Sequence, residues 1–160
     1  MRFSLLVFFF LIAFLPMWAG GRYVSSVQRD TLLEKQMNEL QNQATILRNH
    51  IMTAGYMDTG SSPTVEAELA LMATVYNSRI QIINEDFRVV KDTYIVDNDK
   101  INISTIVLRC MNGNNQLLYD EKRQVIESAV GIYSKDTSNL VGTLYTSLPT
   151  QDLEELMSKI

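Results

Sequence analysis

The sequence has 160 residues, 46% of them hydrophobic, and a formal net charge of −4 at pH 7. This length accommodates one ordinary domain and a membrane anchor, and it leaves no room for two full domains. The acidic balance disfavours a nucleic acid or an anionic lipid surface as a partner. A single cysteine, Cys110, excludes an intramolecular disulfide, and its apolar context IVLRCM predicts a buried structural thiol.

An apolar segment opens the chain. Residues 3–21 read FSLLVFFFLIAFLPMWAGG without a charge, close to the roughly 20 residues that a helix needs to cross a membrane. We therefore predict an uncleaved transmembrane anchor over residues 1–22, with Trp18 and Tyr23 at the interface. The alternative is a signal peptide that is cleaved near the small residues 19–21. Basic residues flank both ends of the segment, so charge alone does not give its orientation.

A long helix is predicted to follow the anchor, over residues 23–55. Apolar residues recur in it at alternating spacings of four and three. The seam consists of Leu33, Met37, Leu40, Ala44, Leu47, Ile51 and Ala54. It fits a coiled coil between two copies of the chain, and it equally fits an amphipathic helix that packs on its own domain. His50 lies beside the seam, and we expect it to be solvated because no second ligand stands at metal-binding spacing.

A second helix is expected over residues 63–77, after a loop that reads YMDTGSSPT. Ser62 suits the N-cap of this helix, and Pro63 suits its first position. The predicted apolar stripe is Leu69, Met72, Ala73 and Tyr76.

Residues 78–148 carry the signals of a sheet. The runs RIQII and FRVV flank the polar turn NED at residues 84–86, which predicts a hairpin. Side chains in both runs alternate between an apolar and a mixed face, with Phe87 and Val89 on the same face. A hairpin of this kind is expected to be covered by helices from one side.

The rest of the chain adds strands and a final helix. The segment ISTIVLRCM fits either a helix or a strand, and the loop NGNNQ follows it. Two strands are predicted within residues 122–134 and 140–148, around the turn KDTSN, and a helix is predicted over residues 149–160. The element order predicts an α+β fold: a long N-terminal helix and a central antiparallel sheet of about four to five strands, flanked by helices.

The segments SRIQIINEDFRVVKDTY, QVIESAVGIYS, NLVGTLYTSL and DLEELMSKI, behind an anchor and a rising helix, resemble the extracytoplasmic PAS-like (Cache, or PDC) sensor domain of bacterial sensor histidine kinases. The resemblance implies that residues 23–160 form a sensor domain outside the cell membrane. It also implies a homodimer through the N-terminal helix and a small-molecule or protein signal. The kinase domain, with its ATP, would lie beyond this chain.

Polar and aromatic side chains on the predicted strands are the candidate ligand-binding residues. They are Arg79, Tyr94, Tyr119, Arg123, Glu127 and Tyr133. Arginine and tyrosine donors can orient a carboxylate-bearing metabolite, although each residue could instead serve packing or surface charge. We expect no catalytic residue, metal site or cofactor in this chain. Asp92 and Glu127 are conceivable as a carboxylate pair, but solvated strand ends are the simpler interpretation.

Other functions fit the same pattern. A chemoreceptor or a cyclic-dinucleotide synthase can carry the same kind of sensor domain. A pilin-like or bitopic assembly protein would share the layout of an apolar helix and a head, although the apolar span here lacks the acidic residue of pilins. A secreted binding protein requires cleavage near Gly21. An apolar span encoded directly after Ile160 would favour the receptor, and a stop codon there would favour the structural protein.

Overall fold

The structure is a computed structural model that describes residues 30–151. The predicted anchor over residues 1–22 and the predicted terminal helix lie outside these residues. Among the described residues, no helix has both the length and the apolar character that a membrane crossing requires. The chain divides into two compact units, and the second begins at Met37. The first is described only over residues 30–36, which are helical.

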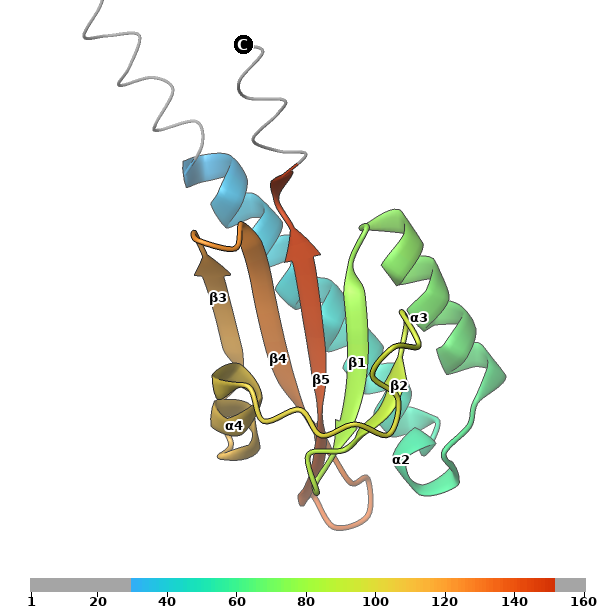
Figure 1. Ribbon diagram of the computed structural model, residues 1–160. Helices are drawn as coiled ribbons and strands as arrows, with labels where there is room; N and C mark the ends of the chain where they lie inside the picture. The colour runs from blue at the N-terminus through green and yellow to red at the C-terminus, as the bar shows by residue number, and fades with distance from the viewer. Residues whose placement is uncertain (1–29, 152–160) are drawn as a thin grey trace, which may run out of the picture. The chain divides into compact units, whose positions relative to one another are not determined.

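A five-stranded sheet organises the second unit, with the order β2-β1-β5-β4-β3 and antiparallel pairing between all neighbours (Figure 1). The strands are β1 (Arg79–Asn84), β2 (Val89–Asp92), β3 (Gln116–Asp120), β4 (Val125–Tyr133) and β5 (Leu140–Pro149). The predicted α+β class and the antiparallel sheet are therefore confirmed. The edge strand β3 was not predicted.

The helices follow the predicted order with one addition. Residues 30–53 are helical, and α3 (Pro63–Val75) and α4 (Thr105–Met111) follow further along the chain. The ambiguous run ISTIVLRCM therefore contains a helix. Inside the predicted loop lies α2 (Tyr56–Thr59), a short helix between two left-handed glycines, Gly55 and Gly60. Ser62 occupies the N-cap of α3 as expected, but its side chain makes no capping hydrogen bond.

The β1–β2 hairpin is confirmed, and its turn is longer than predicted. The side-chain oxygen of Asn84 accepts hydrogen bonds from the backbone N–H groups of Asp86 and Arg88, at 3.1 and 2.9 Å. Phe87 adopts a left-handed conformation with φ of 61°. Phe87 therefore belongs to the turn, and β2 begins at Val89. The strand assignment of Phe87 was wrong because the side chain of Asn84 stabilises a wider turn than the run NED suggests.

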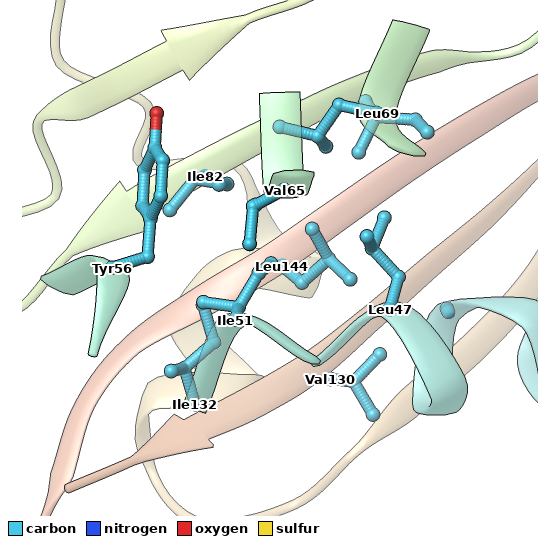
Figure 2. Close-up of a cluster of buried hydrophobic side chains, with 11 residues drawn as sticks. Leu47, Ile51, Tyr56, Val65, Leu69, Ile82, Val130, Ile132 and Leu144 are labelled. Carbon is cyan, nitrogen blue, oxygen red and sulfur yellow. The ribbon is translucent and has the colours of Figure 1, made fainter. Parts of the chain in front are cut away.

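The long helix packs on one face of the sheet. Ala44, Leu47 and Ile51 are at most 1% exposed, and they contact apolar side chains of α3 and of the central strands. Figure 2 shows Leu47 and Ile51 beside Val130 of β4 and Leu144 of β5. The seam between Ala44 and Ile51 is thus the buried stripe of an amphipathic helix on its own domain. Ala54, the last predicted seam residue, is exposed.

A second cluster covers part of the opposite face. Val107 and Cys110 of α4 pack against Ile83 of β1 and Ala129 of β4. Helices therefore lie on both faces of the sheet, and the prediction of one-sided cover was wrong. The short α4 was not recognised as a helix, so its cover of the mixed face could not be foreseen. The Cys110 thiol is buried as predicted, and this burial raises its pKa.

The two leucines Leu144 and Leu71 provide a matched test of this core. We expect Leu144→Ala to lower the free energy of unfolding by about 3 kcal/mol, because Leu144 is fully buried and its removal leaves a cavity. Leu71→Ala should change it by less than about 0.5 kcal/mol, because Leu71 is 63% exposed on α3. Urea denaturation of both variants measures the difference, and equal losses would contradict the assigned core.

Candidate functional site

The candidate site lies on the face of the sheet that carries α4. Arg79 of β1, Ser147 of β5 and Glu127 of β4 stand opposite one another across three neighbouring strands. Directly paired residues project to the same face, so Arg79 and Glu127 share it. The next row on this face contains Gln81, Tyr145 and Ala129; Ala129 belongs to the cluster beneath α4, and the partly buried Tyr145 packs against that cluster with its hydroxyl group on the polar side. One end of the face is therefore polar, whereas the rest is apolar.

Two adjoining pockets open on this polar end. The sheet pocket, of about 330 Å³, lies between the strands and residues 97–104. Its lining residues are Arg79, Gln81, Val89, Asp97, Lys100, Ile101, Asn102, Ile103, Ser104, Arg123, Glu127 and Tyr145. The α4 pocket, of about 550 Å³, is lined by Ser104, Thr105, Ile106, Arg109, Gln116, Leu117, Leu118, Arg123 and Glu127. Ser104, Arg123 and Glu127 line both pockets.

Glu127 provides a carboxylate at the junction of the two pockets. Its side chain is only 6% exposed. Arg123 Nη2 donates a hydrogen bond to Glu127 Oε2 at 2.7 Å, and Tyr145 Oη donates to Glu127 Oε1 at 2.5 Å. Burial raises the pKa of the Tyr145 hydroxyl, and the bond to the Glu127 carboxylate raises it further. Tyr145 therefore remains a neutral donor at physiological pH.

Arg123 serves a second carboxylate as well. Its Nε donates at 2.7 Å to Oδ2 of Asp120, the last residue of β3. Asp120 Oδ1 also accepts the backbone N–H groups of Lys122 and Arg123, so this carboxylate shapes the turn. The Arg123 side chain is 58% exposed. One solvent-accessible guanidinium thus bridges a turn carboxylate and a buried strand carboxylate.

Arg79 lines the side of the sheet pocket away from the α4 pocket, and it binds the carboxylate of Asp92 there. Its Nε and Nη2 donate to the two carboxylate oxygens of Asp92 at 3.0 and 2.6 Å, and Nη2 also donates to Asp97 at 2.6 Å. Asp92 is fully buried, which by itself raises the pKa of its carboxyl. Hydrogen bonds from Arg79 and from the backbone N–H groups of Asp97 and Tyr94 outweigh burial and lower that pKa below its ordinary value. Asp92 is therefore ionised, and it orders the chain that leaves β2.

The wall opposite the strands is attached to the sheet at several points. Asn98 accepts the backbone N–H of Asp92 at 2.8 Å, and Asn102 Nδ2 donates to Gln81 Oε1 at 2.9 Å. Lys100 Nζ donates to Asp97 at 2.9 Å. Hydrogen bonds to β2 and β1 thus position residues 97–104 as a wall of the pocket.

Comparisons with known proteins identify the architecture. No protein-family model and no curated protein matches the sequence. The sensor domain of Escherichia coli DcuS matches the structure with a TM-score of 0.58 and 11% identity, over 76% of this chain and 97% of that chain. The ligand-binding domain of the Campylobacter jejuni chemoreceptor Tlp3, in complex with 4-methylisoleucine, matches with a TM-score of 0.60 and 17% identity, over 82% and 58%. The extracellular domain of a protein described as the histidine kinase rpHK1S-Z16 matches with a TM-score of 0.59 and 14% identity. The match covers 83% of this chain and 59% of that chain.

This chain has the fold of an extracytoplasmic PAS-like sensor domain. It spans nearly the whole of the DcuS sensor domain and less than two thirds of the other two domains. The PAS-like fold expected from the sequence is therefore confirmed.

Three of the six predicted ligand residues meet in the sheet pocket and the α4 pocket, namely Arg79, Arg123 and Glu127. Tyr94 does not line either pocket. It is 51% exposed, its ring centroid lies 5.4 Å from the Arg79 guanidinium carbon, and it borders a separate groove between α3 and β2. Tyr94 therefore contributes a cation–π contact to Arg79, the arginine that binds Asp92 and Asp97.

The other two predicted tyrosines lie away from both pockets. Tyr119 pairs with Ile126 and therefore lies on the face opposite Glu127, because neighbouring residues along β4 alternate in direction. Tyr133 lies at the end of β4 remote from Glu127. His50 Nδ1 donates a hydrogen bond to Glu68 Oε2 at 2.7 Å, and the His50 side chain is 52% exposed. No group of three or more metal-binding side chains occurs within residues 30–151.

Sequence reasoning missed Tyr145, Gln81, Asn102 and Ser104. Tyr145 and Gln81 are directly paired, but pairing needs the register of β1 on β5, which no local pattern reveals. Asn102 and Ser104 lie in a connection without periodicity. The Asn-x-Ser spacing there was a usable signal, because the Asn102 side chain accepts the backbone N–H of Ser104 in a local turn.

Asp92→Asn tests the ion pair behind the sheet pocket. We expect it to lower the free energy of unfolding at pH 7 by about 2 kcal/mol or more, because Arg79 loses a buried charged acceptor. The folded pKa of Asp92 is below its ordinary 3.8, so this share of stability is complete above 3.8 and is lost as pH falls through the folded pKa. Urea denaturation should therefore show the gap between wild type and variant shrinking in strong acid.

Asp136→Asn is the matched control, because Asp136 is exposed in the β4–β5 turn. Its stability should follow that of the wild type at every pH. A gap between wild type and Asp92→Asn that stays constant down to strong acid would contradict the assigned pKa direction.

Proposed function

We propose that this chain is the extracytoplasmic signal-sensing module of a membrane receptor, and that the receptor is a two-component sensor histidine kinase. The observation that supports this most is the pair of pockets around Glu127, built into a fold shared with sensor domains. A merely structural head domain has no need for a positioned polar pocket in the middle of its sheet. Catalysis and ATP binding belong to a kinase domain outside this chain.

The strand β4 offers a route from the pocket to the long helix. Glu127 lies on the pocket face, and Val130 of the same strand packs in the cluster that includes Leu47 on the other face. A ligand that binds one arrangement of β4 and β5 more tightly shifts the population towards it. That shift reaches the helix through direct side-chain packing, and it is limited to the ligand's differential affinity for the two arrangements.

The long helix then carries the change towards the membrane in this proposal. Residues 1–22 form the anchor, and the module lies outside the membrane. The homodimer forms through the N-terminal helix before Leu40, because the seam residues Leu40, Ala44, Leu47 and Ile51 are buried within their own unit. The signal is a small molecule in the pockets.

A chemoreceptor is the second candidate for the whole protein. It is favoured by the fold shared with the ligand-binding domain of Tlp3, at a TM-score of 0.60. Either output is compatible with the same sensing step.

A fusion of alkaline phosphatase to the C-terminus of the full chain tests the location. The enzyme needs disulfides, which form outside the cytoplasm, so we expect high phosphatase activity in intact bacteria. A fusion that lacks residues 1–22 should lose this activity. A fluorescent protein that matures only in the cytoplasm can be fused to the same position. Fluorescence of that fusion, together with an inactive phosphatase fusion, would contradict the proposed orientation.

A chimera tests the sensing step. The full chain is joined, through a second membrane span, to the cytoplasmic part of a well-characterised histidine kinase. We expect Glu127→Gln to change the autophosphorylation level by at least about fivefold, the lower end of ordinary coupling between sites. Asp136→Asn should leave the level unchanged. Equal phosphorylation in wild type and Glu127→Gln would argue against a sensing role for this pocket.

A further inference from the structure

The ion pairs around the two pockets are not evenly distributed. On the Arg79 side, two cations, Arg79 and Lys100, face two carboxylates, Asp92 and Asp97. On the other side, Arg123 is the only cation that pairs with Asp120 and Glu127 within the described residues. The two carboxylates of this second cluster therefore share one guanidinium, whereas Arg109, which also lines the α4 pocket, forms no ion pair with either of them.

Of the two acids that share Arg123, Glu127 is the one that borders the pockets. Asp120 is the last residue of β3, its side chain is 27% exposed, and two backbone N–H groups donate to it. Glu127 is 4% exposed and lines both pockets. A buried carboxylate needs a cation or several donors in place of water. Its guanidinium partner is more than half exposed and shared, so the compensation within the chain is incomplete.

Glu127 also has hydrogen-bonding capacity to spare. A carboxylate offers about four acceptor sites, and the protein fills one on each oxygen, from Arg123 and Tyr145. Ser104 lines the same junction, and its Oγ is buried without a hydrogen-bond partner among the described residues. Buried polar atoms are normally paired, so an unpaired hydroxyl at a pocket wall is a second, independent indication of a missing polar ligand.

We propose that this site binds a small molecule through a positively charged amine, with the Glu127 carboxylate as its counter-ion and Ser104 Oγ as a further acceptor. An ammonium group supplies three donors and one positive charge, which meets both deficits at the junction. The pocket sizes of about 330 and 550 Å³ suit a small metabolite. This inference rests on the proposed sensing function and specifies the ligand of that same site.

The cations of the pockets argue against a dicarboxylate at this position. Arg79, Lys100 and Arg123 are each held by an internal carboxylate, so a dianion would have to displace Asp97 or Glu127. Arg109 lines the α4 pocket and forms no ion pair with a described carboxylate. Its guanidinium can bind one anionic group of a ligand. An amino acid, which carries a carboxylate as well as an amine, should therefore bind more tightly than a simple alkylamine.

The test uses four probes with the same five-carbon chain on the purified full-length protein in detergent. They are pentylamine, 2-aminopentanoate, pentanoate and glutarate. Isothermal titration calorimetry should detect binding of the two amines at millimolar concentration, with 2-aminopentanoate tighter, and no binding of pentanoate or glutarate. Absence of binding by both amines, or tighter binding by glutarate, would overturn the proposal.

Two substitutions of the same ion pair should act in opposite directions. Glu127→Gln removes the counter-ion and should weaken amine binding at least about tenfold, as expected for a lost charge-assisted hydrogen bond. Arg123→Gln removes the competing cation and should strengthen amine binding or leave it unchanged. Equal weakening by both substitutions would mean that the pair only supports the fold, and it would refute the counter-ion role. Urea denaturation of each variant verifies folding, and Asp136→Asn should bind as the wild type does.

The two proposals fail in different ways. Binding of glutarate or pentanoate that is lost with Glu127→Gln, together with a responsive chimera, would reject the amine and keep the sensing function. A chimera that does not respond to Glu127→Gln, combined with amine binding, would keep the ligand class and reject the signalling role.

Discussion

The structure depends on the burial of its central strands on both faces. The side chains of β4 from Ile126 to Ile132 are all buried, with the long helix against one face and α4 against part of the other. A polar side chain on such a strand loses its hydration and must find partners within the protein. This constraint explains why Glu127 and Asp92, both on the α4 face, are engaged by arginine and by additional donors. The polar end of the sheet is thus a cluster of compensated charges within an apolar framework.

The buried Asp92 carboxylate connects that framework to the pocket wall. It accepts hydrogen bonds from two backbone N–H groups of the segment that leaves β2, while Arg79 of the neighbouring strand binds both of its oxygens. A connection of this length, without regular structure, would ordinarily vary in conformation. Here one ionised group orders it, so the position of the wall depends on electrostatics as much as on packing.

Much of the fold was predictable from local patterns, and most of the site was not. Alternation and turn residues gave the β1–β2 hairpin and the strands β4 and β5. The strand β3 was missed because QLLYD is short and lies between a polar loop and a charged turn. Phe87 was misplaced because the turn geometry depends on a side-chain hydrogen bond that composition does not display. For the site, residue type pointed to Arg79, Arg123 and Glu127. Which tyrosine would join them depended on strand register, and the one that does, Tyr145, is not among those predicted.

The sharing of Arg123 between two carboxylates has an energetic consequence. The Arg123 side chain is 58% exposed, so water and Asp120 can stabilise its guanidinium when it leaves Glu127, whereas the buried Glu127 carboxylate then needs another cation in its place. Glu127 has no such freedom, because its strand is fixed between two packed layers. The Glu127 carboxylate is therefore fixed in place, whereas the Arg123 guanidinium can move away. A ligand with a positive group binds Glu127 by displacing Arg123. When no such ligand is bound, Arg123 pairs with Glu127 and stabilises the buried carboxylate.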